Sequence, residues 1–333
     1  MAGVSVHKST IVRTNIGNRL RRSALAFAER DAPWLGARLA VRMWMTVPRT
    51  KAWPALTEPG ERVLLRAAGR RTASVAAESW GDGDGPCVYL LHGWGGYRGQ
   101  MGAFVRPLAD AGFRVVAVDA LGHGESGPGW YGRGRGLMPD FTAALEAAID
   151  RFGPPQGIIA HSMGAATAAV AALDGLAAGR LVLIAPIPSP GSAIDLYAAL
   201  AGIGPRVRAR MPRRIERIAR KPVRHFDAVS RAAERDELAP ALIIHDVTDR
   251  IVPFDLSAAL AAAWPGGQLE RTEGLGHGRI LADPRVVGRA VEFVAGVPAG
   301  APAPGTPTLG TPRPGAPRPG APSPGTAALG PMS

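Results

Sequence analysis

The stretch Gly157-Ile158-Ile159-Ala160-His161-Ser162-Met163-Gly164-Ala165 is the most informative part of this chain, because a short apolar run stops abruptly at a serine among small residues. A strand that turns sharply into a helix presents such a serine at the tip of the turn. Small residues at Ala160 and Gly164 let the flanking backbones approach closely. The helix that follows points free N–H groups and its positive dipole end at this position. Taken alone, the pattern fits either a catalytic nucleophile or an ordinary strand-to-helix turn.

Length and composition favour one large domain with appendages, since the chain has 333 residues, of which 46% are hydrophobic. No apolar run approaches the ~20 residues that span a membrane. The basic segment from Met1 to Arg22 lacks an apolar stretch followed by a cleavage site, so no secretory signal is predicted. Because Cys87 is the single cysteine, no internal disulfide is expected, and we predict a cytoplasmic protein.

The net charge of +12 raises the question of a nucleic-acid or anionic-membrane partner, because basic surfaces attract phosphate. Arginine greatly outnumbers lysine, and Ala, Gly and Pro are abundant, which a GC-rich coding bias produces without selection for any partner. No nucleic-acid-binding motif or basic stripe interleaved with aromatic residues accompanies the charge. We therefore predict no nucleic-acid partner.

Composition divides the chain into three regions. Residues 296–333 are rich in Pro, Gly and Ala with near-repeats, and are predicted to form a disordered tail. Residues 61–295 hold the main domain. Residues 1–60 form a basic, partly amphipathic N-terminal extension, which could lie on a membrane surface, although we favour packing against its own domain. Its apolar residues Leu35, Leu39, Val41, Met43, Trp44 and Met45 lie among Arg38 and Arg42.

In the main domain, short apolar runs alternate with helical patterns, which predicts an α/β fold with a mostly parallel sheet flanked by helices. We expect the first two strands to be antiparallel. The predicted strands are Arg62–Arg66, Thr72–Trp80, Val88–Leu91, Arg114–Val118, Gly157–Ala160, Leu181–Ala185, Ala241–His245 and Gln268–Thr272. The predicted helices are Gln100–Ala111, Met138–Phe152, Met163–Ala177, Phe254–Ala263 and Pro284–Ala295.

Residues 187–239 interrupt this alternation. The segment is too long for a simple crossover loop and contains a strongly basic helical stretch from Arg206 to Arg224. Because it separates two predicted strands, we expect a helical cap insertion above the strand ends.

A serine nucleophile needs a histidine base within hydrogen-bond reach, and the base needs an orienting carboxylate. The strand Ala241–His245 runs into a loop that contains Asp246 and Asp249, and His277 lies on a glycine-flanked loop after the last strand. A tetrahedral intermediate also needs donors for its oxyanion, and the backbone N–H of Met163 would be one.

The order serine, aspartate, histidine at successive strand-to-helix junctions resembles the α/β-hydrolase superfamily, in particular serine esterases, lipases and lysophospholipase-like hydrolases, over residues 61–295. The resemblance implies the α/β-hydrolase fold and a triad of Ser162, His277 and Asp249, the aspartate that shortly precedes the Val252-Pro253 pair. Asp246 would then be a structural turn residue. Ala160 stands where this family usually has glycine.

The segment Leu90-Leu91-His92-Gly93-Trp94-Gly95-Gly96 resembles the His-Gly-X loop of the same family. The match assigns the second oxyanion donor to the backbone N–H of Trp94, whose side chain would wall the acyl pocket. We interpret His92, His123 and His161 as structural residues bonded to loop backbone. No spacing among the seven histidines predicts a metal site, and no cofactor is required.

These features predict a serine hydrolase that acts on a carboxylic ester or related acyl bond. An acyltransferase, a thioesterase or a serine peptidase would keep the same triad, and a non-catalytic ligand-binding homologue would keep the scaffold. Dehalogenases and epoxide hydrolases of this superfamily place an aspartate at the elbow, which Ser162 argues against. The arginines of the cap fit either attraction of an anionic or phospholipid head group or a solvated face of a helical cap. Together with the amphipathic N-terminus, the first alternative would imply a lipid-like substrate and weak association with a membrane surface.

Overall fold

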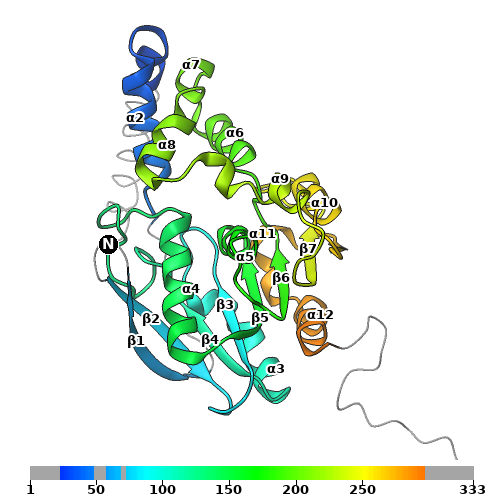
Figure 1. Cartoon of the computed structure of the whole chain (residues 1–333). Helices are drawn as coiled ribbons and strands as arrows, with labels where there is room; N and C mark the ends of the chain where they lie inside the picture. Colours follow the sequence, from blue (N-terminus) through cyan, green and yellow to red (C-terminus); the bar gives the residue numbers. More distant parts are fainter. Residues whose placement is uncertain (1–22, 49–57, 69–72, 297–333) are drawn as a thin grey trace, which may run out of the picture. The chain divides into compact units, whose positions relative to one another are not determined.

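Within residues 23–48, 58–68 and 73–296, which the computed structural model describes, eight strands form one sheet (Figure 1). The strands are β1 (Glu61–Ala67), β2 (Ala73–Trp80), β3 (Cys87–Leu91), β4 (Arg114–Val118), β5 (Pro155–His161), β6 (Arg180–Ile184), β7 (Ala241–Asp246) and β8 (Gln268–Thr272). Their order in the sheet is β1-β2-β4-β3-β5-β6-β7-β8. β2 pairs antiparallel with β1 and β4, whereas the other neighbours are parallel. The predicted mostly parallel sheet with an antiparallel early pair is confirmed.

The helices follow the predicted alternation with the strands. Those outside the β6–β7 connection are α2 (Pro33–Trp44), η1 (Arg98–Phe104), α3 (Val105–Asp110), α4 (Met138–Phe152), α5 (Met163–Leu173), α10 (Phe254–Ala263), α11 (Gly276–Arg279), η3 (Ile280–Ala282) and α12 (Pro284–Ala295). The β6–β7 connection contains α6 (Pro190–Ala201), α7 (Pro205–Arg208), α8 (Met211–Ala219), η2 (Val223–Phe226) and α9 (Ala228–Ala232). Residues 23–31 are also helical.

Two predicted helices differ in detail from the structure. The helix expected over Gln100–Ala111 is a 3-10 helix followed by a short α-helix. Pro107 lacks the N–H that an α-helix running through from residue 100 would need, but it is tolerated in the first turn of α3. The helix expected to reach Ala177 ends at Leu173, because Gly175 adopts a φ of 101° and the chain turns back so that the Leu176 amide bonds the Ala171 carbonyl.

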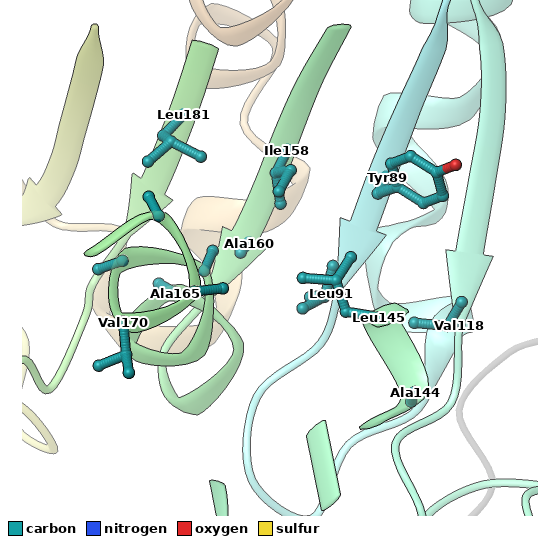
Figure 2. Close-up of a cluster of buried hydrophobic side chains, with 14 of the residues drawn as sticks. Tyr89, Leu91, Val118, Ala144, Leu145, Ile158, Ala160, Ala165, Val170 and Leu181 are labelled. Atoms are coloured by element: carbon teal, nitrogen blue, oxygen red, sulfur yellow. The ribbon is translucent and has the colours of Figure 1, made fainter. Parts of the chain in front are cut away.

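The hydrophobic core lies on both faces of the sheet. On one face α4, α5 and α10 cover the strands, and on the other η1, α3 and α12 do so. Figure 2 shows the first of these layers, where Tyr89 and Leu91 of β3 and Ile158 of β5 lie with Leu145 of α4 and Val170 of α5. β3 is buried at every residue, as its continuous apolar run predicts for a parallel strand covered on both sides.

Helix α2 packs against α7 and α8 of the β6–β7 connection. The approach is close, because a Cβ on Gly36 would lie 2.5 Å from a methyl group of Val207. The carboxylate of Glu29 accepts hydrogen bonds from the amides of Arg206 and Val207 at 2.6 and 2.9 Å, and so caps the start of α7. The expectation that this amphipathic segment packs on its own domain is confirmed for α2.

The remainder of the N-terminal extension, residues 1–22 and 49–57, and the tail from residue 297 onward lie outside the described residues. Among the helices of the described ranges, none is both long and apolar enough to cross a membrane.

Candidate active site

Ser162 occupies a strained turn between β5 and α5. Its φ of 52° and ψ of −113° are unusual for a residue with a side chain, and its amide donates to the Ile184 carbonyl at 2.8 Å. Such strain costs about 1–3 kcal/mol, and persists only where the surrounding structure imposes it. One cause is the close approach at Gly164, where a Cβ would lie 2.5 Å from the His92 carbonyl oxygen. The turn forms with Ala160 in the position where the family usually has glycine, and the methyl group of Ala160 lies in the core (Figure 2).

His277 and Asp249 are hydrogen-bonded. His277 Nδ1 donates to Asp249 Oδ2 at 2.7 Å, and Asp249 Oδ1 accepts the amides of Ile251 and Val252 at 2.7 and 3.0 Å. Burial of the Asp249 carboxyl favours its neutral form, but the hydrogen bonds from His245, His277 and the two amides outweigh burial and hold its pKa below the usual range. The carboxylate therefore stays ionised and fixes the proton of His277 on Nδ1, which leaves Nε2 free to accept one.

Asp249 also binds a second histidine, which the sequence analysis did not assign to the site. His245 Nε2 donates to the same Oδ2 atom at 3.1 Å, and the Ser257 hydroxyl donates to His245 Nδ1 at 2.6 Å. The side chains of His245 and Asp249 are completely buried. The sequence does offer one indication, since His245 is a polar, fully buried residue of β7 that follows the apolar run Ala241–Ile244, four residues before Asp249.

Asp246 has the structural role that the sequence predicts for it. Its carboxylate accepts hydrogen bonds from the amide and hydroxyl of Thr248, from the Thr272 hydroxyl and from the Leu275 amide, at 2.5–2.9 Å. Burial again opposes ionisation, but these donors outweigh it and lower the pKa of Asp246. Asp246 thus ties the loop after β7 to the loop after β8, which carry Asp249 and His277.

His161, directly before Ser162, connects the turn to the His277 loop. Its Nε2 donates to the His277 carbonyl at 2.9 Å, and the two imidazole rings lie 4.6 Å apart between centroids. Burial and the neighbouring His277 lower the pKa of His161 to about 3, so that the ring is neutral at physiological pH. The predicted bond from His161 to loop backbone is confirmed, and it holds the His277 loop close to Ser162.

The loop after β3 passes next to Ser162. A Cβ on Gly93 would lie 2.9 Å from His161 Nδ1 and 3.1 Å from the Ser162 Cβ, so a larger residue would require these neighbours to shift. The amides of Trp94 and Met163 donate to no acceptor within the described part of the chain. Two unpaired N–H groups beside a serine are what an oxyanion site requires.

A mostly apolar cavity that is partly open to solvent adjoins the turn through Met163. Its other walls come from α2, the start of α4 and the β6–β7 connection, including Trp44, Leu137, Ile187, Ile215 and Phe226. The indole of Trp94 does not line this cavity, contrary to the sequence-based expectation. It packs instead against His123 and Phe141, with ring centroids at 5.1 and 6.5 Å.

The three predicted catalytic side chains therefore lie at the carboxyl ends of the parallel strands β5, β7 and β8, with Ser162 and Asp249 buried and His277 slightly exposed. Across the described residues, hydrogen bonds join Asp249 to His277 but none joins the Ser162 hydroxyl to His277. This last bond often forms only when substrate is bound. The described ranges hold no group of three or more His, Cys, Asp or Glu side chains arranged to bind a metal ion.

His92 and His123 bond to loop backbone as predicted. His92 donates to Gly93 and accepts the Ala120 amide, and His123 donates to the Leu121 carbonyl. Burial lowers the pKa of His92 to about 4 and, with the added effect of His92, that of His123 to about 3. Both rings are therefore neutral at physiological pH. His92 belongs to the loop after β3 that carries Trp94, and His123 packs against Trp94 from the loop after β4.

We expect replacement of His123 by Gln to flatten the pH dependence of stability. The folded-state pKa of His123 lies below its ordinary value of 6.5, so between 6.5 and about 3 only the unfolded state binds this proton. Stability is therefore lost as the pH falls through this range, by up to about 1.4 kcal/mol per pH unit for one group. Urea unfolding at a series of pH values should show a shallower slope for His123→Gln, whereas parallel curves would contradict the argument.

Comparison with known proteins supports the α/β-hydrolase fold. The sequence profile of a family described as serine aminopeptidase, S33, matches residues 85–238, which include Ser162 but neither Asp249 nor His277. An esterase from Rhodococcus has a similar structure, with a TM-score of 0.51 and 20% sequence identity, over 71% of this chain and 99% of that one.

Two curated relatives match over about a third of this chain. Epoxide hydrolase B of Mycobacterium tuberculosis is 34% identical over 110 residues, which are 32% of this chain and 29% of that protein. A bifunctional esterase/perhydrolase of Acinetobacter calcoaceticus is 30% identical over 114 residues, which are 33% of this chain and 40% of that protein. The matched part of this chain thus spans less than half the length of either relative.

Proposed function

We propose that the chain, which has the α/β-hydrolase fold, is a serine hydrolase that cleaves a carboxylic ester, with Ser162 as nucleophile, His277 as base and Asp249 as the orienting acid. The observation that carries this proposal is the 2.7 Å bond between His277 and Asp249, at strand ends next to a strained serine turn. A structural turn has no need of a buried carboxylate that fixes the tautomer of a neighbouring histidine.

In the proposed reaction, Ser162 Oγ attacks the ester carbonyl while its proton passes to His277 Nε2. The negative charge that develops on the carbonyl oxygen is stabilised by the amides of Met163 and Trp94. The C–O bond then breaks, and His277 gives its proton to the departing alkoxide. Water, deprotonated by His277, attacks the acyl-enzyme and releases the acid and free Ser162. Asp249 stabilises the imidazolium in both steps.

The apolar cavity beside Met163 supports an ester with a hydrocarbon acyl group. Its lining is almost free of polar side chains, and burial of each methylene of an acyl chain there contributes about 0.8 kcal/mol. We assign the role of a cap to residues 187–239, because Ile187, Ile215 and Phe226 form one wall of this cavity. The catalytic triad alone would also serve an acyltransferase or a thioesterase, and the apolar lining favours neither of them.

Epoxide hydrolysis is the second hydrolytic activity among the curated relatives. Epoxide hydrolases of the superfamily that this chain resembles place an aspartate at the turn, where this chain has Ser162. A serine ester intermediate is therefore the favoured route, and the esterase/perhydrolase relative supports the same chemistry.

Reaction with a fluorophosphonate probe tests the proposal directly, since only an activated serine attacks phosphorus. We expect the native protein to take up one probe per chain at Ser162, with parallel loss of p-nitrophenyl ester hydrolysis. Heat-denatured protein should take up none. A native protein that stays unlabelled would refute the hydrolase and would favour the non-catalytic ligand-binding alternative.

A further inference from the structure

One face of the molecule gathers arginine side chains that lack acidic partners. Arg38 and Arg42 of α2 lie beside Arg213, Arg214 and Arg217 of α8, and together they line two adjoining hollows, the second of which also includes Arg135. We call this set the α2–α8 arginine face. Figure 1 shows the two helices side by side, away from the strand ends of β1 and β2.

No carboxylate neutralises this face. All 27 Asp and Glu residues of the chain lie within the described ranges, yet no ion pair there involves any of its arginines. Glu216, the acidic residue of α8, accepts the Val223 amide instead. The Nε atom of Arg214 is shut off from solvent and has no hydrogen-bond partner in the described part of the chain. Unpaired charge gathered in this way attracts an external anion.

Large apolar side chains are exposed on α2 and on the helical segment before it. Trp34, which lines one hollow together with Arg213 and Arg217, is 66% exposed. Leu35 of the same helix is 47% exposed, and Phe27 of the preceding helical segment is 60% exposed. Exposed aromatic and aliphatic residues next to arginines match the two layers of a bilayer surface, which offers phosphate outside and hydrocarbon beneath.

We propose that the α2–α8 arginine face docks on the surface of a membrane that contains anionic phospholipids. The guanidinium groups bind lipid phosphates, and Trp34, Leu35 and Phe27 enter the interface between head groups and acyl chains. Nucleic acid also presents phosphates, but its backbone offers no apolar layer to Leu35 and Phe27. The face therefore favours lipid over nucleic acid.

The same two helices wall the apolar cavity, through Trp44 of α2 and through Ile215 and Ala219 of α8. Docking would bring the cavity close to the acyl chains of the membrane. The use of this proximity to reach a lipid ester rests on the proposed function, whereas docking itself does not. The test therefore measures binding and not hydrolysis.

The test is sedimentation of the full chain with vesicles of phosphatidylcholine alone or mixed with phosphatidylglycerol. We expect binding to the mixed vesicles that weakens at high salt, and little binding to the neutral ones. The triple variant Arg38→Glu, Arg213→Glu, Arg217→Glu should lose at least about 100-fold in affinity for mixed vesicles. A matched control, Arg66→Glu, Arg151→Glu, Arg285→Glu, removes the same net charge from β1, α4 and α12 and should lose far less.

Equal losses in the two triple variants would show a diffuse effect of net charge and overturn the proposal. Equal binding to neutral and mixed vesicles would overturn it as well. A third outcome would also overturn the proposal: the wild type binds double-stranded DNA and no vesicles, and the first triple variant does not bind the DNA. Ester hydrolysis measured on a water-soluble substrate reports the proposed function separately, because none of these arginines lies at the triad.

Discussion

Substitution Ser162→Ala lowers kcat for a short p-nitrophenyl ester by at least about 10⁴-fold while the fold survives, if Ser162 is the nucleophile. Alanine removes the oxygen that forms the acyl-enzyme, and His277 has no other hydroxyl to activate at this turn. Alanine also has the same backbone preferences as serine at a φ of 52°, so that the strain in the turn is unchanged. The Tm should therefore stay within a few degrees of the wild type, as measured by circular dichroism.

The matched control is Ser192→Ala in α6, a serine of the cap whose hydroxyl has no hydrogen bond among the described residues. Its kcat should be close to that of the wild type. Retained activity in folded Ser162→Ala would remove Ser162 from the chemistry. It would leave the turn between β5 and α5 as a purely structural feature, which is the alternative that the sequence pattern alone leaves open.

The sheet could be predicted because its physical cause is local. β3, β5, β6 and β7 are covered by helices on both faces, so each contains a continuous apolar stretch in the sequence. The ends of helices were harder to predict from the sequence. The end of α5 depends on the left-handed conformation of Gly175, and the 3-10 turn before α3 depends on where Pro107 falls relative to the helix start.

In the candidate site, the sequence predicts only those residues whose type and place directly after a strand indicate a catalytic role. Ser162 follows the apolar run of β5 and Asp249 follows that of β7, whereas His277 follows the largely polar strand β8. The carboxyl ends of these parallel strands meet at one edge of the sheet. The bond from His245 to Asp249 depends on how the loop after β7 folds back, which no spacing rule encodes. Likewise, Trp44 reaches the cavity because α2 packs on α8, a contact between segments about 170 residues apart in sequence.

The contacts of Asp249 explain why its substitution should have the second-largest effect. Each oxygen of the carboxylate accepts two N–H groups: Oδ1 those of Ile251 and Val252, and Oδ2 those of His245 and His277. An asparagine at position 249 must turn its NH₂ group toward one of these pairs of N–H groups. A hydrogen-bond donor then points at two other donors, and no hydrogen bond forms there. Either the turn opens, or His277 shifts its proton to Nε2, where it can no longer accept the proton of Ser162.

We therefore expect Asp249→Asn to lower kcat by about 10⁴-fold, with a smaller change in KM, because substrate contacts lie elsewhere.

Asp246→Asn is the discriminating comparison. Its carboxylate also receives only N–H and O–H donors, but they come from Thr248, Thr272 and Leu275, so the loss should appear mainly in the free energy of unfolding, at about 1–3 kcal/mol for each unpaired buried group. Kinetics normalised to the folded fraction from urea unfolding separates the two effects. If Asp246→Asn abolished kcat in folded protein and Asp249→Asn did not, the acid of the triad would be Asp246, and the His245–Asp249–His277 cluster would be a structural clamp.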